Sequence, residues 1–503
     1  MLKILSAQQT RALDAYTIAH EPIASIDLME RASQAFTDWF TGRFDITRRT
    51  GIVCGTGNNG GDGLAIARLL KVWGYHVQVW VVKGGTPETE DFKINRARMG
   101  DVVVTDITTS PEDAIFHTCD VLIDALFGSG LSRPVEGIYA EVIQRINESN
   151  ATRIAVDIPS GLRADAASQG EVVRARYTVS FQLPKLGFLF PNSVQFVGQW
   201  CLLDIGLSKD FLKQVAVSHY YLTPRAIRRR LKDRSQFDHK GTFGHALLVA
   251  GSVGKMGAAV LASRAVLRAG AGLLTVHAPT CGYVVLQTAV PEAMVIQDVS
   301  PDYTSGVAGV DKYTTIGIGP GLGQAQPTVE ALGKVLRQFR KPMVIDADAL
   351  NILAAHPEML EFVPPGSILT PHPKEFERMA GPWRDDFQRL ELQKDLAARL
   401  KSVVVLKGAH TSIAAPDKTV YFNATGNPGM ATGGTGDVLT GLLTGLLAQA
   451  YSAVDAAIIG VYLHGLAGDR AARDLGQESL IASDLIEAFP GAFRQIRQSG
   501  KRI

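Results

Sequence analysis

The chain has few cysteines, and this scarcity limits the kinds of site it can hold. Its 503 residues include four, Cys54, Cys119, Cys201 and Cys281, which lie far apart with no CxxC spacing and no paired histidines. Such a pattern argues against a disulfide framework and against a zinc site. We therefore expect a protein of the reducing cytoplasm.

Long apolar runs are missing as well. The N-terminal segment MLKILSAQQTRALD turns polar after five residues, so it lacks the apolar core of a signal peptide. The most apolar region, residues 438–468, is interrupted by polar side chains, whereas a bilayer span needs roughly 20 uninterrupted apolar residues. We expect buried helices in this region and no membrane contact.

The chain also lacks an excess of either charge. Its formal charge is +2, from 51 basic and 49 acidic residues, which provides no general attraction to nucleic acid or to an anionic membrane. Three consecutive arginines, residues 228–230, follow Pro224 in what reads as a basic helix. A solvated helix face explains them better than a nucleic-acid patch.

Two nucleotide-binding signatures are absent. The nearest approach to GxxxxGK[ST], residues 251–257 (GSVGKMG), has the wrong spacing and carries Met256 after its lysine. No HRD and DFG pair accompanies a kinase-type glycine loop. These absences disfavour a P-loop NTPase and a protein kinase.

The pattern that is present is that of an α/β protein. Short β-branched runs alternate with Gly-rich or acidic turns and amphipathic stretches, which is typical of βαβ units. The expected strands are residues 51–54, 76–82, 121–124 and 153–157 in the first half and 245–250, 273–277, 314–318, 342–346 and 402–406 in the second. Each half has enough strands for a doubly wound sheet, and no fixed repeat relates the two halves.

A chain of this length predicts more than one domain, and two large ones fit the pattern. Residues 207–223 (LSKDFLKQVAVSHYYLT) carry neither a Gly-rich turn nor clear periodicity. We place the boundary within 217–222, which predicts one domain over 1–217 and another over 222–503.

The first glycine-rich turn, GTGNNGGDG, follows the strand GIVC. Gly55, Gly57 and Gly60 satisfy GxGxxG, which indicates a dinucleotide site. The next expected strand ends at Lys83, without an acid to bind a ribose hydroxyl, and this weakens the case for an ordinary Rossmann dehydrogenase.

The same turn contains Asn58, Asn59 and Asp62, which a phosphate cradle does not need. Further oxygen ligands occur where later strands end, at Asp124, Asp157 and Ser160. Strand ends of an open α/β sheet meet at one crevice, so this set is expected to surround a small cation. Turn formation or helix capping would explain any one of these residues alone, but not the set.

In the second half, residues 432–440 read TGGTGDVLT. Backbone amides of a Gly-rich turn and the start of a helix attract anions, so a carboxylate there requires its own chemical role. Sugar and vitamin kinases of the ribokinase-like superfamily have a similar arrangement. The resemblance implies that Asp437 accepts a proton from a substrate hydroxyl beside the phosphoryl group. Helix capping is the alternative.

Other polar residues of this half allow two interpretations each. His372 between two prolines could be a ligand contact or a rigid turn residue. Asp346 and Asp348 could hold Mg²⁺ through water or cap the helix that begins at ALNIL. Lys407 follows a buried-looking strand and precedes Gly408, which favours a phosphate contact over a surface position.

Together the motifs resemble a known family of fused proteins, the bifunctional NAD(P)H-hydrate repair enzymes. GTGNNGGDG, DALFGSGLSRP and VDIPSG resemble its epimerase domain over residues 1–217. GSVGKMGAAV, GIGPGLG, DADALN, TPHPKEF, KGAHT and TGGTGD resemble its ADP-dependent dehydratase domain over 222–503. The resemblance implies a Rossmann-like αβα domain followed by a ribokinase-like αβα domain.

For the first domain, the resemblance implies a potassium ion held by Asn59, Asp124 and Ser160, with Asp157 at the reacting end of the substrate. It also implies that two segments contact the damaged nucleotide, formed by Asn58, Asn59, Gly60, Gly61 and Asp62 and by Gly128, Ser129, Gly130, Leu131, Ser132, Arg133 and Pro134.

For the second domain, the resemblance implies a hydrated nicotinamide site lined by Ala258, Gly321, His372 and Asp437. The co-substrate, ADP or ATP, would contact Lys407, Gly408, Ala409, His410, Thr411 and Gly436. We also expect Mg²⁺ and self-association into a homo-oligomer. Two alternatives stay open at this point: a ribokinase-like kinase of a small hydroxylated substrate, and a nucleotide-binding scaffold whose first domain has lost catalysis.

Overall fold

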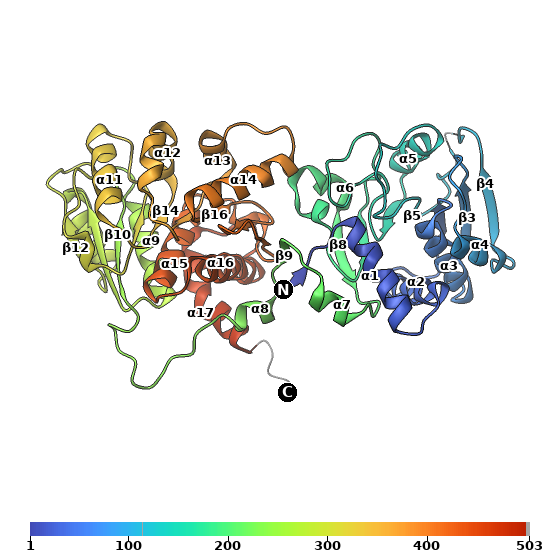
Figure 1. Ribbon diagram of the computed structural model, residues 1–503, viewed down its shortest axis with the longest axis horizontal. Coiled ribbons are helices and arrows are strands. Elements are labelled where there is room, and N and C mark those ends of the chain that lie inside the picture. The colour runs from blue at the N-terminus through green and yellow to red at the C-terminus, as the bar shows by residue number, and fades with distance from the viewer. Residues whose placement is uncertain (113, 499–503) are drawn as a thin grey trace. The chain divides into compact units, whose positions relative to one another are not determined.

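The computed structural model describes residues 1–112 and 114–498 (Figure 1). The chain divides into two compact units, Leu2–Val217 and Ser218 onward, with Met1 assigned to the second. This division falls inside the segment that lacks a Gly-rich turn. Within the described part of the chain, none of the helices combines the length and hydropathy that a bilayer crossing requires.

The first unit is built on a sheet in which all neighbouring strands are parallel. Its order is β4-β3-β2-β5-β6-β7-β8. The strands are β2 (Thr50–Cys54), β3 (Val77–Val82), β4 (Val103–Ile107), β5 (Val121–Ala125), β6 (Thr152–Val156), β7 (Tyr177–Phe181) and β8 (Gln199–Leu203). A two-residue strand, β1 (Leu2–Lys3), precedes them.

Helices cover both faces of this sheet (Figure 1). They are α1 (Ala7–His20), α2 (Ser25–Thr41), α3 (Asn58–Val72), α4 (Glu90–Ala97), α5 (Ile138–Glu148), α6 (Val194–Val197) and α7 (Lys209–Gln214), with 3₁₀ turns at Leu186–Leu189 and Pro191–Ser193. Side chains alternate along a strand, so Ile52 packs with Phe36 and Leu64 of α2 and α3, whereas Val53 packs with Ile143 of α5. The expected three-layer αβα domain is confirmed.

The chain order reverses between β2 and β5, and a crevice forms at their carboxyl ends. The turns after these strands approach so closely that a Cβ on Gly55 would lie 2.1 Å from the Leu126 carbonyl oxygen. A Cβ on Gly60 would lie 1.9 Å from the Gly55 carbonyl oxygen. The glycines of GTGNNGGDG therefore bring the start of α3 against the segment that follows β5.

The second unit contains a larger sheet, ordered β9-β18-β17-β16-β15-β14-β13-β10-β11-β12. Its strands are β9 (His219–Tyr221), β10 (His245–Val249), β11 (Leu273–Ala278), β12 (Met294–Gln297), β13 (Thr315–Ile318), β14 (Val344–Ile345), β15 (Ile368–Leu369), β16 (Val403–Leu406), β17 (Ser412–Ala414) and β18 (Val420–Phe422). Strands β10 to β16 pair in parallel, whereas β17 is antiparallel to both neighbours.

Figure 1 shows α11 (Gln326–Gln338), α12 (Ala347–Ala355), α13 (Pro373–Ala380) and α14 (Asp386–Leu400) on one face of this sheet. On the other face lie α9 (Met256–Ala269), α15 (Thr435–Ala448), α16 (Ala453–Leu475) and α17 (Ala482–Gln498). The remaining helices are α8 (Pro224–Arg228) and α10 (Tyr283–Ala289), with 3₁₀ turns at Thr280–Gly282, Val310–Lys312, Pro357–Phe362 and Pro428–Met430. The basic helix expected after Pro224 is thus short and ends at Arg228.

Two glycines of α15 let this helix contact the backbone of α9. A Cβ on Gly441 would lie 2.1 Å from the Ala262 carbonyl oxygen, and one on Gly445 would lie 2.6 Å from the Val266 carbonyl oxygen. Side chains at these positions would push the helices apart. The contact therefore fixes where the first turn of α15, which carries Asp437, meets the sheet.

Gly441→Ala is expected to destabilise the second unit by about 2 kcal/mol, because the added methyl collides with backbone and overpacks the interface. Helix propensity alone would favour alanine by about 1 kcal/mol. Gly333→Ala on α11 is the matched control, since its nearest atoms belong to the flexible ends of Arg337 and Met359. Thermal melts of both variants check this, and an unchanged melting temperature for Gly441→Ala would contradict it.

Candidate active site

The oxygen ligands expected around a small cation meet at the crevice of the first unit. Ser160 donates its hydroxyl to Asp124 Oδ1 at 2.6 Å and its amide to Asp124 Oδ2 at 2.8 Å. Asn59, at the start of α3, donates its side-chain amide to the Phe127 carbonyl at 3.0 Å. All three predicted ligands are buried, and the loop after β5 joins them.

This donor set fits a monovalent cation. It combines the side-chain oxygens of Asn59, Asp124 and Ser160 with the Phe127 carbonyl, and hard oxygen donors suit such an ion. Burial raises the pKa of Asp124 to about 6, because the hydrogen bonds from Ser160 offset only part of the lost hydration. A potassium ion in this place would supply the missing positive charge.

The two segments expected to contact a nucleotide lie at the same crevice. Asn58 to Asp62 were expected in a loop, but they form the first turns of α3, because the close approach of Gly60 to Gly55 lets the helix begin at Asn58. Gly128 lies against Asn59, with an ideal Cβ 3.5 Å from the Asn59 Cβ. The remainder of the segment, up to Pro134, is partly or fully exposed and lines the opening.

Asp157 directly follows β6 in a left-handed backbone conformation, with a φ of 63°. Its Oδ1 accepts hydrogen bonds from the Ser180 hydroxyl at 3.1 Å, from the Phe181 amide at 3.0 Å and from Lys185 Nζ at 2.5 Å. Asp14 of α1 lies near this pair. Burial, followed by repulsion from Asp157, raises the pKa of Asp14 to about 6.

In the second unit, α15 begins where the sequence predicts an anion site. Gly434 precedes the helix with a φ of 92°, and Asp437 lies in the first turn. The first amides of a helix have no intrahelical acceptors and point outward at the positive end of the helix dipole. The turn TGGTGD therefore offers amides to an anion and places a carboxylate beside them.

An ion pair between Lys407 and Asp346 lies beside this turn. Lys407, after β16, donates to Asp346 Oδ1 at 2.9 Å, and the Thr440 hydroxyl of α15 donates to Asp346 Oδ2 at 2.6 Å. Asp346 is at the N-cap position of α12, yet its side chain makes no capping hydrogen bond. The capping interpretation of Asp346 is therefore wrong, because its oxygens bind Lys407 and Thr440 instead.

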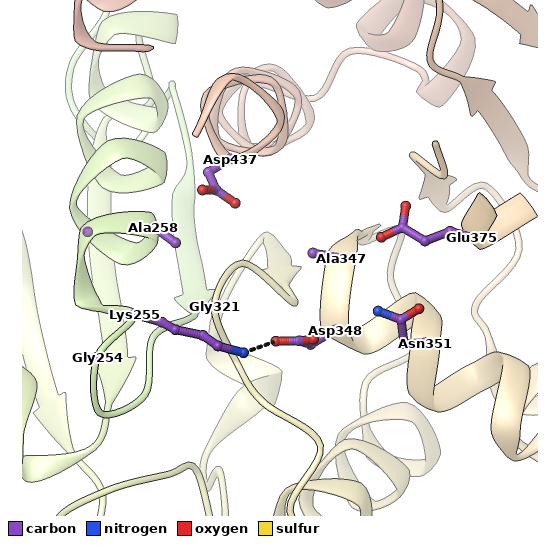
Figure 2. A pocket seen from close by; sticks show the side chains of 10 residues that line it. Gly254, Lys255, Ala258, Gly321, Ala347, Asp348, Asn351, Glu375 and Asp437 are labelled. Carbon is purple, nitrogen blue, oxygen red and sulfur yellow. Dashed lines mark hydrogen bonds and ion pairs between the residues drawn. The ribbon is translucent and has the colours of Figure 1, made fainter. Parts of the chain in front are cut away.

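Asp437 faces a cavity of about 420 Å³. The cavity is lined by Gly254, Lys255, Gly257, Ala258, Gly321, Ala347, Asp348, Asn351, Glu375 and Asp437. Figure 2 shows the Asp437 carboxylate and the Ala258 side chain pointing toward the same space. Burial, followed by repulsion from Asp346, raises the pKa of Asp437 to about 6. Its carboxylate is therefore a stronger base than an exposed one.

Asp348 lies across this cavity and accepts hydrogen bonds from the Gly323 amide at 2.8 Å and from Lys255 Nζ at 3.2 Å (Figure 2). It therefore holds the turn after β13 rather than capping α12. Because lysines neutralise both Asp346 and Asp348, these carboxylates are poor direct ligands for Mg²⁺. The sequence suggested that these carboxylates hold Mg²⁺ through water, and that role stays a prediction.

The other predicted contacts lie beside the cavity rather than in its lining. His372 caps α13, since its Nδ1 accepts the amides of Lys374 and Glu375 at 3.1 and 3.3 Å. His372 thus serves as a helix cap, and its contact with a ligand stays a prediction. Its capping partner Glu375 reaches the cavity. The segment from Gly408 to Thr411 forms a tight turn, in which the Thr411 hydroxyl donates to the Gly408 carbonyl at 2.9 Å.

Comparisons with known proteins agree with both halves of this architecture. A family model described as NAD(P)H-hydrate dehydratase matches residues 246–490, and one described as YjeF-related protein N-terminus matches residues 25–187. The bifunctional NAD(P)H-hydrate repair enzyme Nnr of Moorella thermoacetica is 37% identical over 525 residues, which cover 99% of this chain and 98% of that protein. The chain belongs to the bifunctional NAD(P)H-hydrate repair enzyme family.

Two further similarities concern this family and its fold. The bifunctional NAD(P)H-hydrate repair enzyme Nnr of Escherichia coli K12 is 36% identical over 471 residues, which cover 92% of this chain and 88% of that protein. A solved structure described as a ribokinase-like superfamily protein from Enterococcus faecalis covers 56% of this chain and 98% of that chain. It is 28% identical, with a TM-score of 0.50, and it supports the ribokinase-like fold of the second unit.

Sequence reasoning missed several residues of the two repair-enzyme sites. In the first unit these are Asp14 and Lys185, and in the second they are Lys255, Asn351, Glu375 and Thr440. Glu375 lies within TPHPKEF, one of the motifs that carry the family resemblance, whereas Lys185 lies in no such motif and follows none of the expected strands. Asp14 also lies in no such motif, because it is part of α1, far along the chain from the residues of the crevice.

Asp437→Asn is expected to stabilise the second unit by about 2 kcal/mol at pH 7.5, since it removes a buried charge. The folded pKa of about 6 lies above the ordinary value of 3.8, so the destabilisation by the ionised carboxylate is complete above about pH 6. The difference from the parent chain shrinks as pH falls below 6 and vanishes below 3.8. Melts at pH 7.5 and 4.5 measure it, with exposed Asp474→Asn as the control. Equal melting temperatures at pH 7.5 would contradict the expectation.

Proposed function

We propose that this chain repairs hydrated NADH and NADPH in two steps. The first domain interconverts the R and S hydrates at C6 of the nicotinamide ring, and the second dehydrates the S hydrate with consumption of ADP. Membership of the family supports this assignment. The observation that carries it is the Asp437 carboxylate, which lines a cavity with Ala258 and Gly321 at the amide-rich start of α15.

In the dehydratase, Asp437 accepts the proton of the C6 hydroxyl while the terminal phosphoryl group of the nucleotide transfers to that oxygen. The amides at the start of α15 stabilise the charge on the phosphoryl oxygens. The C6–O bond then breaks with phosphate as the leaving group, a proton is lost from C5, and the C5–C6 double bond forms. Phosphate leaves far more readily than hydroxide, which is the reason for using a nucleotide.

In this proposal the nucleotide lies over Lys407 to Thr411 and Gly436. An ideal Cβ on Gly436 would lie 3.6 Å from Lys407 Nζ, so the lysine and the start of α15 adjoin one space. A phosphate there would meet both the ammonium group and the helix amides. The two groups favour the same ligand.

In the epimerase, Asp157 handles a proton during interconversion of the two hydrates, and Asn59, Asp124 and Ser160 would hold a potassium ion that orders the crevice. Asn59 supports this role because it lies in the first turn of α3 and contacts the loop after β5. The ion would bind and orient the segments on either side of the substrate. It would take no part in the proton transfer.

The proposal also places the enzyme in the reducing cytoplasm. The four cysteines are free thiols, and Cys54 and Cys119 are buried. This agrees with the expectation that the chain has no disulfide framework. Self-association into a homo-oligomer stays a prediction.

A single assay tests the proposal: the full chain is incubated with the separated hydrate epimers and ADP, and the absorbance of reduced nicotinamide is followed. We expect recovery from both epimers. A stable phosphorylated product without reduced nicotinamide would instead indicate a small-substrate kinase. Recovery from the S hydrate alone would reject the epimerase half.

Asp437→Asn is expected to lower the rate of dehydration of the S hydrate by about 10³-fold, because loss of a general base costs roughly 10²–10⁴-fold. Epimer interconversion, measured by separating the two hydrates, should be unchanged and serves as the internal control for folding. A variant that dehydrates at the parent rate would disprove the assignment of Asp437.

Asp157→Asn is expected to lower epimer interconversion by about 10²-fold or more while dehydration of the S hydrate continues. Asparagine is chosen because it tolerates the left-handed backbone of this position better than alanine does. The test follows consumption of pure R hydrate. If R hydrate disappears as fast as with the parent chain, Asp157 has no role in proton transfer.

A further inference from the structure

Lys185 is buried beside the first-domain site, and it lies in none of the motifs that point to that site. Its side chain is 6% exposed and that of Asp157 is 13% exposed. A buried ammonium group is costly unless every N–H has an acceptor. Lys185 meets this condition through Asp157 Oδ1, the Ser180 hydroxyl at 2.8 Å and the carbonyls of Phe181 and Leu183, both at 3.3 Å.

Two strained turns meet at this lysine. Asp157 follows β6 with a φ of 63°, and the Ile158 amide closes a tight turn around it at 2.7 Å from the Val156 carbonyl. Gln182 follows the neighbouring strand β7 with a φ of 62°, and the Leu183 amide closes an equivalent turn at 2.7 Å from the Phe181 carbonyl. Such backbone persists only where its surroundings enforce it.

Lys185 connects the two turns directly. Its ammonium group binds the carbonyls on either side of Gln182, and the same group binds the carboxylate of Asp157. The lysine therefore fixes the end of β7 relative to the end of β6. It also fixes the orientation of the Asp157 carboxylate.

The hydrogen bonds to Asp157 divide its two oxygens into different roles. Oδ1 accepts from Ser180, Phe181 and Lys185, whereas Oδ2 accepts no hydrogen bond from the described residues. One oxygen is thus anchored, and the other is available to a substrate. A lysine whose donors are all engaged cannot itself reach the substrate, so it acts through Asp157.

Other acids make the charge of Lys185 necessary. Asp14 on α1 and Asp62 on α3 both interact unfavourably with Asp157, and Asp91 on α4 adds to the repulsion on Asp62. Burial, followed by repulsion from Asp157 and Asp14, raises the pKa of Asp62 well above its usual range. Attraction to Lys185 acts in the opposite direction on Asp14. Lys185 is thus the cation bound to Asp157, the carboxylate that Asp14 and Asp62 repel.

We propose that Lys185 is a positioning residue of the epimerase site, which fixes the Asp157 carboxylate with Oδ2 aimed toward the substrate. The proposal rests on the proposed epimerase function of the first domain. It adds a residue that acts without contacting the hydrated nucleotide.

The test uses the full-length chain and measures interconversion of the separated hydrates between pH 5 and 9. In Lys185→Met we expect at least a 10-fold loss near pH 7, with the acid limb of the rate profile moved to higher pH, because the carboxylate then ionises less readily. Lys185→Arg keeps the charge, so its acid limb should stay in place while its rate falls. Lys93→Met is the matched control, since Lys93 contacts Glu90 at 2.7 Å on the exposed surface of the same unit.

A double-mutant cycle separates positioning from a general structural role. If Lys185 acts through Asp157, Lys185→Met should reduce interconversion less than 2-fold in an Asp157→Asn background. The Asp157→Asn background also removes the buried carboxylate charge that Lys185 neutralises. The cycle therefore stays informative if the Lys185→Met variant alone unfolds at the assay temperature. Dehydration of S hydrate by each variant reports that the second domain remains intact.

The outcomes distinguish the two levels of the proposal. If the parent chain interconverts the hydrates, and Lys185→Met does so at an equal rate with an unshifted pH profile, the role of Lys185 alone is overturned. A further 10-fold loss in the Asp157→Asn background would also overturn it, since the lysine would then act independently. A parent chain that does not interconvert the hydrates would overturn the epimerase function and the positioning role with it.

Discussion

Burying a carboxylate beside a substrate requires a nearby positive charge, and each domain meets this requirement with a lysine from another strand end. In the first domain Asp157 follows β6 and Lys185 lies beyond β7. In the second, Asp346 follows β14 and Lys407 follows β16. Parallel strands make these pairs possible, because their carboxyl ends lie along one edge of the sheet. The pairs then determine where the remaining site residues can lie.

A second carboxyl group in each domain lacks such a partner. Burial, followed by repulsion from Asp346, raises the pKa of Asp437, and burial, followed by repulsion from Asp157 and Asp14, raises the pKa of Asp62. A lysine partner fixes the position of a buried carboxylate, whereas burial without such a partner raises the pKa of a carboxyl group. Each site thus contains one carboxylate fixed by a lysine and one buried carboxyl group with a raised pKa, although the folds and motifs differ.

The sequence was sufficient for most of the strands that are long and buried, although it missed β7, which has five residues and a buried centre. β2, β3, β5, β6, β10, β11, β13 and β16 lie within two residues of their expected bounds, because uninterrupted β-branched runs mark strands covered on both faces. Strand β4 was missed because its residues are largely exposed, and β15 because it has only two residues. Short edge elements depend on their neighbours rather than on their own composition.

Site residues were predictable from the sequence where a motif defines the backbone conformation. They were less predictable where a single side chain contacts a residue far away along the chain. Asp437 at the first turn of α15 was expected because five small residues precede it, and the structure places it there. The partners of Asp346 could not be read from spacing, since Lys407 is 61 residues away and Thr440 is 94 residues away. The sequence signal for Asp346 was a strand end followed by a helix, and that signal equally predicts a cap. Only the packed structure shows that Lys407 and Thr440 hold this carboxylate beside the start of α15, where its repulsion adds to the effect of burial in raising the pKa of Asp437.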